Sequence, residues 1–422
     1  MANNFASNFT RKLAMKVLDA FESERILSKN VNTQLLDGKF DPNSGENVDF
    51  KRPTDYITQR TSDGDISATT ASPILTGKAT GTVQDYITVE MDYQEADEAI
   101  KMGTDKDRFS TDAARRIVTD LELDFAAYMQ KNAGLLAGTV GTAVTTWAHV
   151  AESGAVMASA GIPAGDWCFT VNPYTQTKLA DVQRSLGSVD TLISEAHRKA
   201  IISDNFAGMK VMTATTLPSV TTSAGADRAG TLSANPDVTY ATAKDTMTQT
   251  LAVTAFQANL VVKAGEVIQI AGRNRLNLNT RQPVIDDAGN NVLFTGVVTS
   301  DVTLDGSGAG NIVISGPAIY EATGAYNTVD SAPVSGDVVT LLGSASTIYQ
   351  PNMFWHKQAY AIGSVPIKKL NSTDTIATTQ DGLQLRVSMG SSIRENKQIV
   401  RIDLRPAYAT MNPFFSGHGW GS

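Results

Sequence analysis

The sequence predicts an α+β protein in which an all-β segment interrupts a helix-bearing unit. Residues 110–132 carry a strong helical pattern of apolar residues. Helical periodicity disappears over residues 219–348, and a mixed pattern returns afterwards. With 422 residues, the chain exceeds the size at which a single hydrophobic core usually stops growing. We therefore expect two domains, or one domain that carries a large insertion.

The composition favours an ordered protein and limits its partners. Hydrophobic residues make up 42% of the chain and charged residues 18%, which argues against general disorder. The formal net charge of −8 repels nucleic acid unless a local basic patch overrides it, so the chain can surround DNA without gripping it. The single cysteine excludes an internal disulfide, and no apolar run resembles a membrane span or a signal peptide. We expect a protein made in a reducing cytoplasm.

Residues 5–30 are predicted to form an amphipathic helix. Apolar residues recur at every fourth position, and charged residues occupy the opposite face. Two interpretations stay open: the helix packs on its own domain, or it is an arm that docks on a partner subunit. In the second case, Phe9→Asp or Phe21→Asp leaves a soluble monomer that assembles poorly. The apolar stripe consists of Phe5, Phe9, Leu13, Val17 and Phe21.

Residues 46–95 have the pattern of extended chain, with a long polar connection between two strands. Val48 and Phe50 alternate with polar residues at one end, and residues 86–91 form a strand pattern at the other. A compact domain rarely keeps so long a connection without a use for it. It is either a mobile surface loop or a hairpin that reaches another subunit, where its charges set the register of the contact. Those charges are Lys51, Arg52, Asp55, Arg60, Asp63, Asp65 and Lys78.

The strongest helix pattern in the chain is that of residues 110–132. Ser110 or Thr111 can cap its start, and Asp112 then lies in the first turn, where the helix dipole favours negative charge. Asn132 and Gly134 are stop signals. A helix of this length extends roughly 35 Å and is long enough to be the spine of a domain. Its apolar stripe is Ala113, Ile117, Leu121, Phe125 and Met129.

Two further helices and a short strand are predicted before the all-β segment. Asn172 followed by Pro173 is typical of a helix start, because the first caps and the second fits the first helical position. A second helical stretch covers residues 189–202, and residues 209–213 form a strand pattern.

The all-β segment contains a repeated sequence pattern. Residues 263–272 resemble residues 334–343, since each has a glycine turn, an acidic residue and a strand that a glycine ends. Short strands with such turns are typical of a small barrel or sandwich, and residues 219–348 are expected to fold alone. After this segment, strands are predicted over residues 354–362, 383–389 and 400–404.

No residue pattern predicts catalysis, a cofactor or a metal site. The glycine-rich residues 305–311 lack the following helix of a phosphate loop, and residues 286–290 lack the closing glutamate of a calcium loop. The four histidines lack the paired spacing of a zinc site. Cys168 is predicted to be a small buried hydrophobe, because nothing in the sequence brings a base to it. We therefore expect that the protein is not an enzyme.

Three blocks of the sequence resemble the coat proteins of lambdoid short-tailed bacteriophages. The first comprises Phe50-Lys51-Arg52-Pro53, Arg60-Thr61 and Gly64-Asp65-Ile66-Ser67. The second comprises Gly77-Lys78-Ala79-Thr80-Gly81, Tyr86-Ile87-Thr88-Val89, Tyr93-Gln94, Glu98-Ala99-Ile100-Lys101 and Arg116-Ile117-Val118-Thr119-Asp120-Leu121-Glu122. The third comprises Pro351-Asn352, Gly363-Ser364-Val365-Pro366, Pro406-Ala407-Tyr408 and Asn412-Pro413. Their order and spacing carry the resemblance, which brackets most of the chain outside the all-β segment.

This resemblance implies the Hong Kong 97 phage-type capsid fold with an inserted β-barrel domain. In that fold an N-terminal arm and an extended loop reach neighbouring subunits, a peripheral domain carries a spine helix, and an axial domain lies near the capsomer centre. On this sequence the implied parts are the arm (1–35), the extended loop and peripheral domain with the spine helix (36–137), the first part of the axial domain (138–218), the inserted β-barrel domain (219–348) and the completion of the axial and peripheral domains (349–422).

The resemblance also implies a function and partners. Such coat proteins form pentamers and hexamers of an icosahedral shell that encloses double-stranded DNA without sequence-specific binding. They assemble in the host cytoplasm with a scaffolding protein and a portal protein, and need no cofactor or membrane. The alternative is another β-rich virion or surface protein, such as a decoration protein or an adhesin, and the long helix counts against it. The candidate subunit or scaffold interface residues are Phe5, Phe9, Leu13, Val17, Phe21, Lys51, Arg52, Arg60, Asp63, Asp65 and Lys78.

Overall fold

The computed structural model describes most of the chain, and these residues divide into two compact units. The described residues are 5–33, 47–52, 54–67, 74–94, 106–185, 202, 205–322, 324–365, 367–371, 374–392 and 396–422. The first unit comprises Met1–Val48, Thr80–Ala126 and Tyr360–Ala409, and the second comprises Asp49–Ala79, Ala127–Ala359 and Thr410–Ser422.

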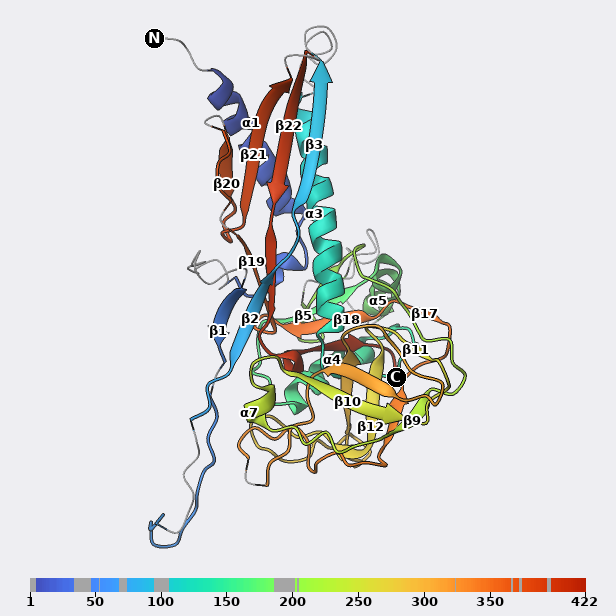
Figure 1. The fold of residues 1–422 in the computed structure, drawn as a ribbon. Coiled ribbons are helices and arrows are strands. Elements are labelled where there is room, and N and C mark those ends of the chain that lie inside the picture. Colours follow the sequence, from blue (N-terminus) through green and yellow to red (C-terminus); the bar gives the residue numbers. More distant parts are fainter. Residues whose placement is uncertain are drawn as a thin grey trace. The chain divides into compact units, whose positions relative to one another are not determined.

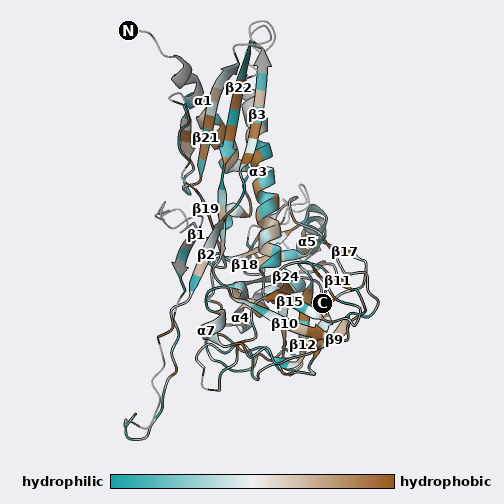
Figure 2. Cartoon of the chain, viewed as in Figure 1, coloured by the Kyte–Doolittle hydropathy of each residue, from teal (hydrophilic) through white to brown (hydrophobic). Residues whose placement is uncertain are grey.

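The first unit contains a four-stranded antiparallel sheet with the order β20-β21-β22-β3, in which β21, β22 and β3 lie side by side (Figure 1). Val400 and Ile402 are buried on β22 whereas Arg401 is exposed, because successive side chains of a strand point to opposite faces. Figure 2 shows this alternation as bands of brown and teal. The predicted strands at 383–389 and 400–404 are confirmed. The strands are β3 (Ile87–Gln94), β20 (Thr375–Thr378), β21 (Gln384–Ser392) and β22 (Lys397–Leu404).

A second four-stranded sheet has the order β1-β2-β23-β19. The prediction of one strand over residues 354–362 is wrong. The chain turns after His356, where Ala359 N–H donates to the His356 carbonyl oxygen at 2.8 Å, and the two halves join different sheets as β18 and β19. The elements are β1 (Asn47–Lys51), β2 (Lys78–Val83), β18 (Asn352–His356), β19 (Tyr360–Ser364) and β23 (Pro406–Thr410).

The predicted spine helix is confirmed as α3 (Lys106–Lys131), whose 26 residues span about 39 Å. It begins four residues before the predicted cap, so Asp112 lies beyond the first turn. All five residues of the predicted apolar stripe are buried, from 6% exposed at Ala113 to 0% at Phe125. The Phe125 ring packs against those of Tyr360 and Tyr408 at centroid distances of 6.5 and 5.0 Å, which places the helix against the first unit's strands.

The second unit contains a six-stranded sheet with the order β4-β24-β18-β5-β7-β6. The predicted helix start at Asn172 is confirmed, because its side-chain oxygen accepts from Thr175 N–H at 2.7 Å. The predicted strand at 209–213 is confirmed as β7, whereas the predicted helix at 189–202 lies outside the described residues apart from Ile202. The elements are β4 (Leu135–Ala137), α4 (Trp147–Ser159), β5 (Trp167–Val171), α5 (Pro173–Ser185), β6 (Asn205–Phe206), β7 (Met209–Thr213), η3 (Pro413–Phe415) and β24 (Ser416–Gly419).

A closed barrel follows in the second unit, with the strand order β10-β15-β13-β12-β16-β9. The two repeated segments supply β12 and β16, which pair with Ile268 opposite Leu341. Both turns need glycine, since Gly265 and Gly336 have φ of 89° and 93°. One hydrophobic cluster joins the barrel interior to residues of the six-stranded sheet. The strands are β9 (Ala229–Leu232), β10 (Thr248–Thr254), β12 (Val267–Asn274), β13 (Leu293–Val298), β15 (Gly310–Ser315) and β16 (Val338–Leu341).

Candidate assembly elements

The N-terminal apolar stripe packs on its own unit. Helix α1 (Phe5–Glu24) contacts β20 and β21, and Val17 and Phe21 are fully buried while Leu13 is nearly so. Of the two interpretations left open by the sequence, these three residues support packing of the helix on its own unit. Phe5 and Phe9 belong to the same helix, and their side chains lie outside the described part of the chain.

Phe21→Asp is consequently expected to disrupt folding. A charge in place of a fully buried ring loses apolar burial and is desolvated without a partner, which costs about 4 kcal/mol or more. Expression should give insoluble or protease-sensitive chain, measured by the soluble fraction and by trypsin digestion. Met15→Asp is the control, because Met15 is 59% exposed on the same helix. A soluble Phe21→Asp monomer with wild-type protease resistance would contradict this expectation.

A buried carboxylate on the spine helix holds the segment that follows α1. Glu122 accepts hydrogen bonds from the backbone N–H groups of Leu27 and Ser28 at 2.7 and 3.0 Å, and from the Ser28 hydroxyl. These residues begin the short 3-10 helix η1 (Ser28–Asn30). Arg25, buried beside them, donates to Ser28 and pairs with Asp381 at 3.0 Å. The sequence pattern missed this site, because Glu122 lies among the charged residues of an apparently solvated helix face.

Residues 56–67 of the extended loop are open to solvent. All residues from 56 to 67 are exposed, including three candidate interface residues. Asp63 and Asp65 shape the tip locally, since each carboxylate accepts the backbone N–H two residues later, at 3.1 and 2.9 Å. The hydrogen bond from Ser67 holds the pKa of Asp65 below its ordinary value. Arg60, Asp63 and Asp65 are thus available to a neighbour.

The candidate residues at the base of the loop behave differently. Lys51 and Lys78 are exposed, and Lys78 pairs with Asp49 at 2.9 Å within the same chain. Arg52 is 7% exposed and donates to the carbonyl oxygens of Lys78, Thr410 and Met411. Burial lowers its pKa to about 10. The prediction of Arg52 as an interface charge is therefore corrected: it stabilises its own subunit by satisfying three backbone carbonyls.

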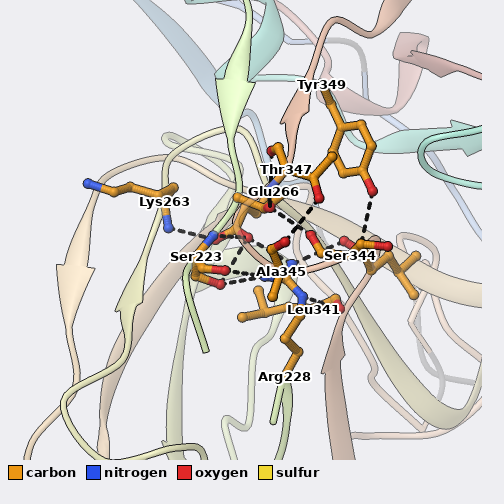
Figure 3. A network of polar contacts seen from close by, with 11 residues as sticks. Ser223, Arg228, Lys263, Glu266, Leu341, Ser344, Ala345, Thr347 and Tyr349 are labelled. Atoms are coloured by element: carbon orange, nitrogen blue, oxygen red, sulfur yellow. Dashed lines mark hydrogen bonds and ion pairs between the residues drawn. The ribbon is translucent and has the colours of Figure 1, made fainter. Parts of the chain in front are cut away.

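A buried polar network ties the barrel to the two strands that lead into and out of it, β8 (Val220–Thr221) and β17 (Ile348–Tyr349) (Figure 3). Glu266 accepts from Arg228 Nη2 at 2.8 Å and from the backbone N–H groups of Ser223 and Lys263 at 2.9 and 2.7 Å. The side chain of Glu266 is fully buried and that of Arg228 is 8% exposed. The acidic residue of the first repeat is thus the centre of this junction.

Buried His418 is expected to make the second unit less stable in acid. Its Nε2 lies 3.0 Å from the Gln130 carbonyl oxygen, and burial lowers its pKa to about 4 from 6.5. Because the folded pKa is below the unfolded one, the neutral ring contributes stability above pH 6.5 that is lost as pH falls through 6.5 toward 4. The loss is about 3 kcal/mol.

His418→Gln is expected to flatten this part of the pH dependence, because a glutamine amide can donate the same bond without titrating. Urea unfolding at pH 7, 6, 5 and 4 measures it. His149→Gln is the control, since His149 is only partly buried. The same fall in unfolding free energy for wild type and His418→Gln would rule out His418 as the cause.

The remaining titratable groups form no candidate active site in the described residues. Burial raises the pKa of Cys168 to about 11, which keeps the thiol protonated and unreactive. Asp286 and Asp305 accept backbone N–H groups of their own turns, from Asn290 at 2.7 Å and Ser307 at 2.8 Å. Among the described residues, no group of three His, Cys, Asp or Glu side chains could hold a metal ion, and no helix is long and apolar enough to cross a membrane.

Comparison with known proteins identifies a family over the whole chain. The family model described as P22 coat protein, gene protein 5, matches residues 1–420. A curated relative, described as the major capsid protein of Acyrthosiphon pisum secondary endosymbiont phage 1, is 33% identical over 425 residues and covers 100% of both chains.

Solved structures similar to this chain include two from phages. One, from Mycobacterium phage Che8, has a TM-score of 0.46 and 11% identity, covering 93% of this chain and 89% of that chain. The other, the capsid structure of the cyanophage P-SCSP1u, has a TM-score of 0.42 and 10% identity, covering 90% and 84%. Family membership rests on the two sequence matches alone, because these structural similarities are too weak to support it.

Proposed function

The chain belongs to the P22 coat protein family and is a phage major capsid protein, and from this membership we propose that a scaffolding protein guides it into the pentamers and hexamers of an icosahedral shell. The shell encloses double-stranded DNA, a portal protein occupies one site in it, and assembly takes place in the host cytoplasm. The protein is a structural component of the virion and not an enzyme.

The exposure of the extended loop supports the proposal that this loop contacts a neighbouring subunit during assembly. Besides its charges, the loop exposes large apolar side chains in an otherwise polar segment: Tyr56 at 53%, Ile66 at 61% and Ile74 at 73%. Apolar side chains gain free energy when a partner covers them, by about 25 cal/mol per Å². Docking of the loop on a second copy of the chain would cover them, and Arg60, Asp63 and Asp65 would select the register.

Electron microscopy of the purified chain, with and without the candidate scaffolding protein, tests the proposal. We expect uniform closed shells with the scaffolding protein and irregular or fewer shells without it. Ile66→Asp should stop shell formation, whereas Ile285→Asp, at an equally exposed position within residues 219–348, should not. Small oligomers under both conditions would refute assembly by this chain, and identical shells under both would refute guidance by the scaffold.

We also propose residues 219–348 as the inserted domain. The closed barrel lies within these bounds, and so does the buried Arg228–Glu266 ion pair. The isolated fragment is expected to give a β-type circular dichroism spectrum and a cooperative thermal transition. A disordered spectrum would contradict the boundaries, and the shared hydrophobic cluster with the six-stranded sheet makes this a demanding test.

A further inference from the structure

Both sides of the extended loop meet one tyrosine of the inserted segment 219–348. Tyr326 accepts a hydrogen bond from Asp55 N–H at 2.8 Å on the outgoing side of the loop, and its hydroxyl donates to the Leu75 carbonyl oxygen at 3.4 Å on the returning side. We call residues 54–55 and 74–78 the loop stem. A single hydroxyl thus bridges two stem positions that are 20 residues apart in sequence.

An aromatic stack fixes the position of this hydroxyl. The rings of Tyr326 and Tyr240 lie 3.6 Å apart with an interplanar angle of 3°. Tyr240 is 4% exposed and belongs to a hydrophobic cluster with Ile319, against which Leu75 of the stem packs. Because Tyr240 opens the short helix α7 (Tyr240–Ala243) of the inserted segment, the stem rests on a packed surface of that segment.

On each side of the stacked rings, further contacts attach the loop stem to the inserted segment. Arg281 pairs with Asp55 at 2.7 Å, and its other nitrogen donates to the Asn327 carbonyl oxygen at 2.7 Å. On the returning side of the loop, Lys78 N–H donates to Asp245 at 3.1 Å. At Gly77 a Cβ would lie 2.6 Å from the Lys244 carbonyl oxygen, so only glycine permits this approach of the stem.

We propose that the inserted segment is the anchor that orders the loop stem before the loop meets a neighbouring subunit. This inference rests on the proposed role of the loop in assembly. The stem is attached while residues 56–67 are exposed, so the anchor acts at the base and leaves the tip open. Ordering the stem in the free subunit reduces the conformational entropy lost on docking, which strengthens the contact without adding to it.

Two variants of the full-length chain remove the anchor by different means. Tyr326→Phe deletes the bridging hydroxyl and keeps the stacked ring, whereas Gly77→Ala pushes the stem from Lys244 without changing the inserted segment. Each has a matched control. Tyr320→Phe changes an exposed tyrosine of the inserted segment, and Gly306→Ala adds a methyl group where nothing lies within 4 Å.

Hydrogen exchange of the unassembled subunit and the concentration of free subunit left after assembly are then measured. Both anchor variants should speed exchange at the Asp55 amide about five- to tenfold and raise the free-subunit concentration about threefold or more. Both controls should match wild type. Unchanged exchange in both variants would overturn the anchor, and faster exchange with a wild-type free-subunit concentration would overturn its role in assembly. Failure of the wild-type chain to form shells would refute the proposed function, while exchange still decides whether the stem is anchored.

Discussion

Glu122→Gln is expected to lower the free energy of unfolding of the unassembled subunit by about 2 to 4 kcal/mol. The Glu122 carboxylate, 2% exposed, receives hydrogen bonds from Leu27 and from both the backbone and the hydroxyl of Ser28. An amide offers one acceptor oxygen and adds a donor group, so at least one buried N–H loses its partner.

The same change removes a negative charge from the surroundings of Arg25. Desolvation lowers the pKa of this buried guanidinium, and Asp381 and Glu122 oppose that effect. When Glu122 is neutral, Asp381 must balance the buried cation with less help, which adds to the loss. The expected loss of stability therefore includes both the missing hydrogen bond and the poorer balance of the Arg25 charge.

Urea unfolding followed by circular dichroism measures the effect, and trypsin cleavage after Lys29 reports whether η1 detaches first. Glu24→Gln is the matched control. Glu24 pairs with Arg115 at 3.0 Å with both side chains well exposed, and its loss should cost below about 0.5 kcal/mol. Equal losses for the two variants would show that Glu122 has no special role.

Glu266→Ala is expected to cost about 3 to 5 kcal/mol, because it leaves Arg228 charged, buried and unpaired. The backbone N–H groups of Ser223 and Lys263 lose their acceptor in the same change. Since the pair is buried, the loss should depend little on salt concentration, unlike that of an exposed pair.

A double variant distinguishes the loss of the ion pair from the cost of leaving Arg228 buried without its partner. Arg228→Met with Glu266→Leu removes both charges and should recover a large part of the stability lost in Glu266→Ala. Lys263→Met is the control, because Lys263 forms an exposed pair with Asp301 at 2.8 Å. A double variant as unstable as Glu266→Ala would show that the hydrogen bonds to the backbone, and not the buried charge, carry the effect.

The sequence predicted correctly those helices and turns that depend on residues close together in the chain. The apolar stripe of α3 and the Asn172-Pro173 helix start depend on residues within a few positions of one another, and the structure contains both. The glycine turns of the repeat depend on φ at Gly265 and Gly336, which the residue type itself reveals. Helix α4 was missed, since its alanines, serines and glycines give a weak apolar stripe around Val150 and Met157.

Long-range contacts decided what the sequence left open. Periodicity showed which face of α1 is apolar but not that β20 and β21 cover it, because those strands follow about 350 positions later. Charge alone could not distinguish Arg52, which is buried against Thr410 and Met411, from Arg60, which is exposed. The same holds for Glu122, whose partners lie almost 100 positions away.

Four features could be predicted from the residues alone: the α+β class, the spine helix, the position of the all-β segment and, through the resemblance to phage coat proteins, the function. These follow from residue type and spacing, which act over a few residues or are shared across a family. Three features required the three-dimensional fold: which charges are buried, which apolar faces are already covered, and where the inserted segment contacts the loop stem. Burial and desolvation depend on segments that are distant in sequence, and no local pattern reports which of them will meet.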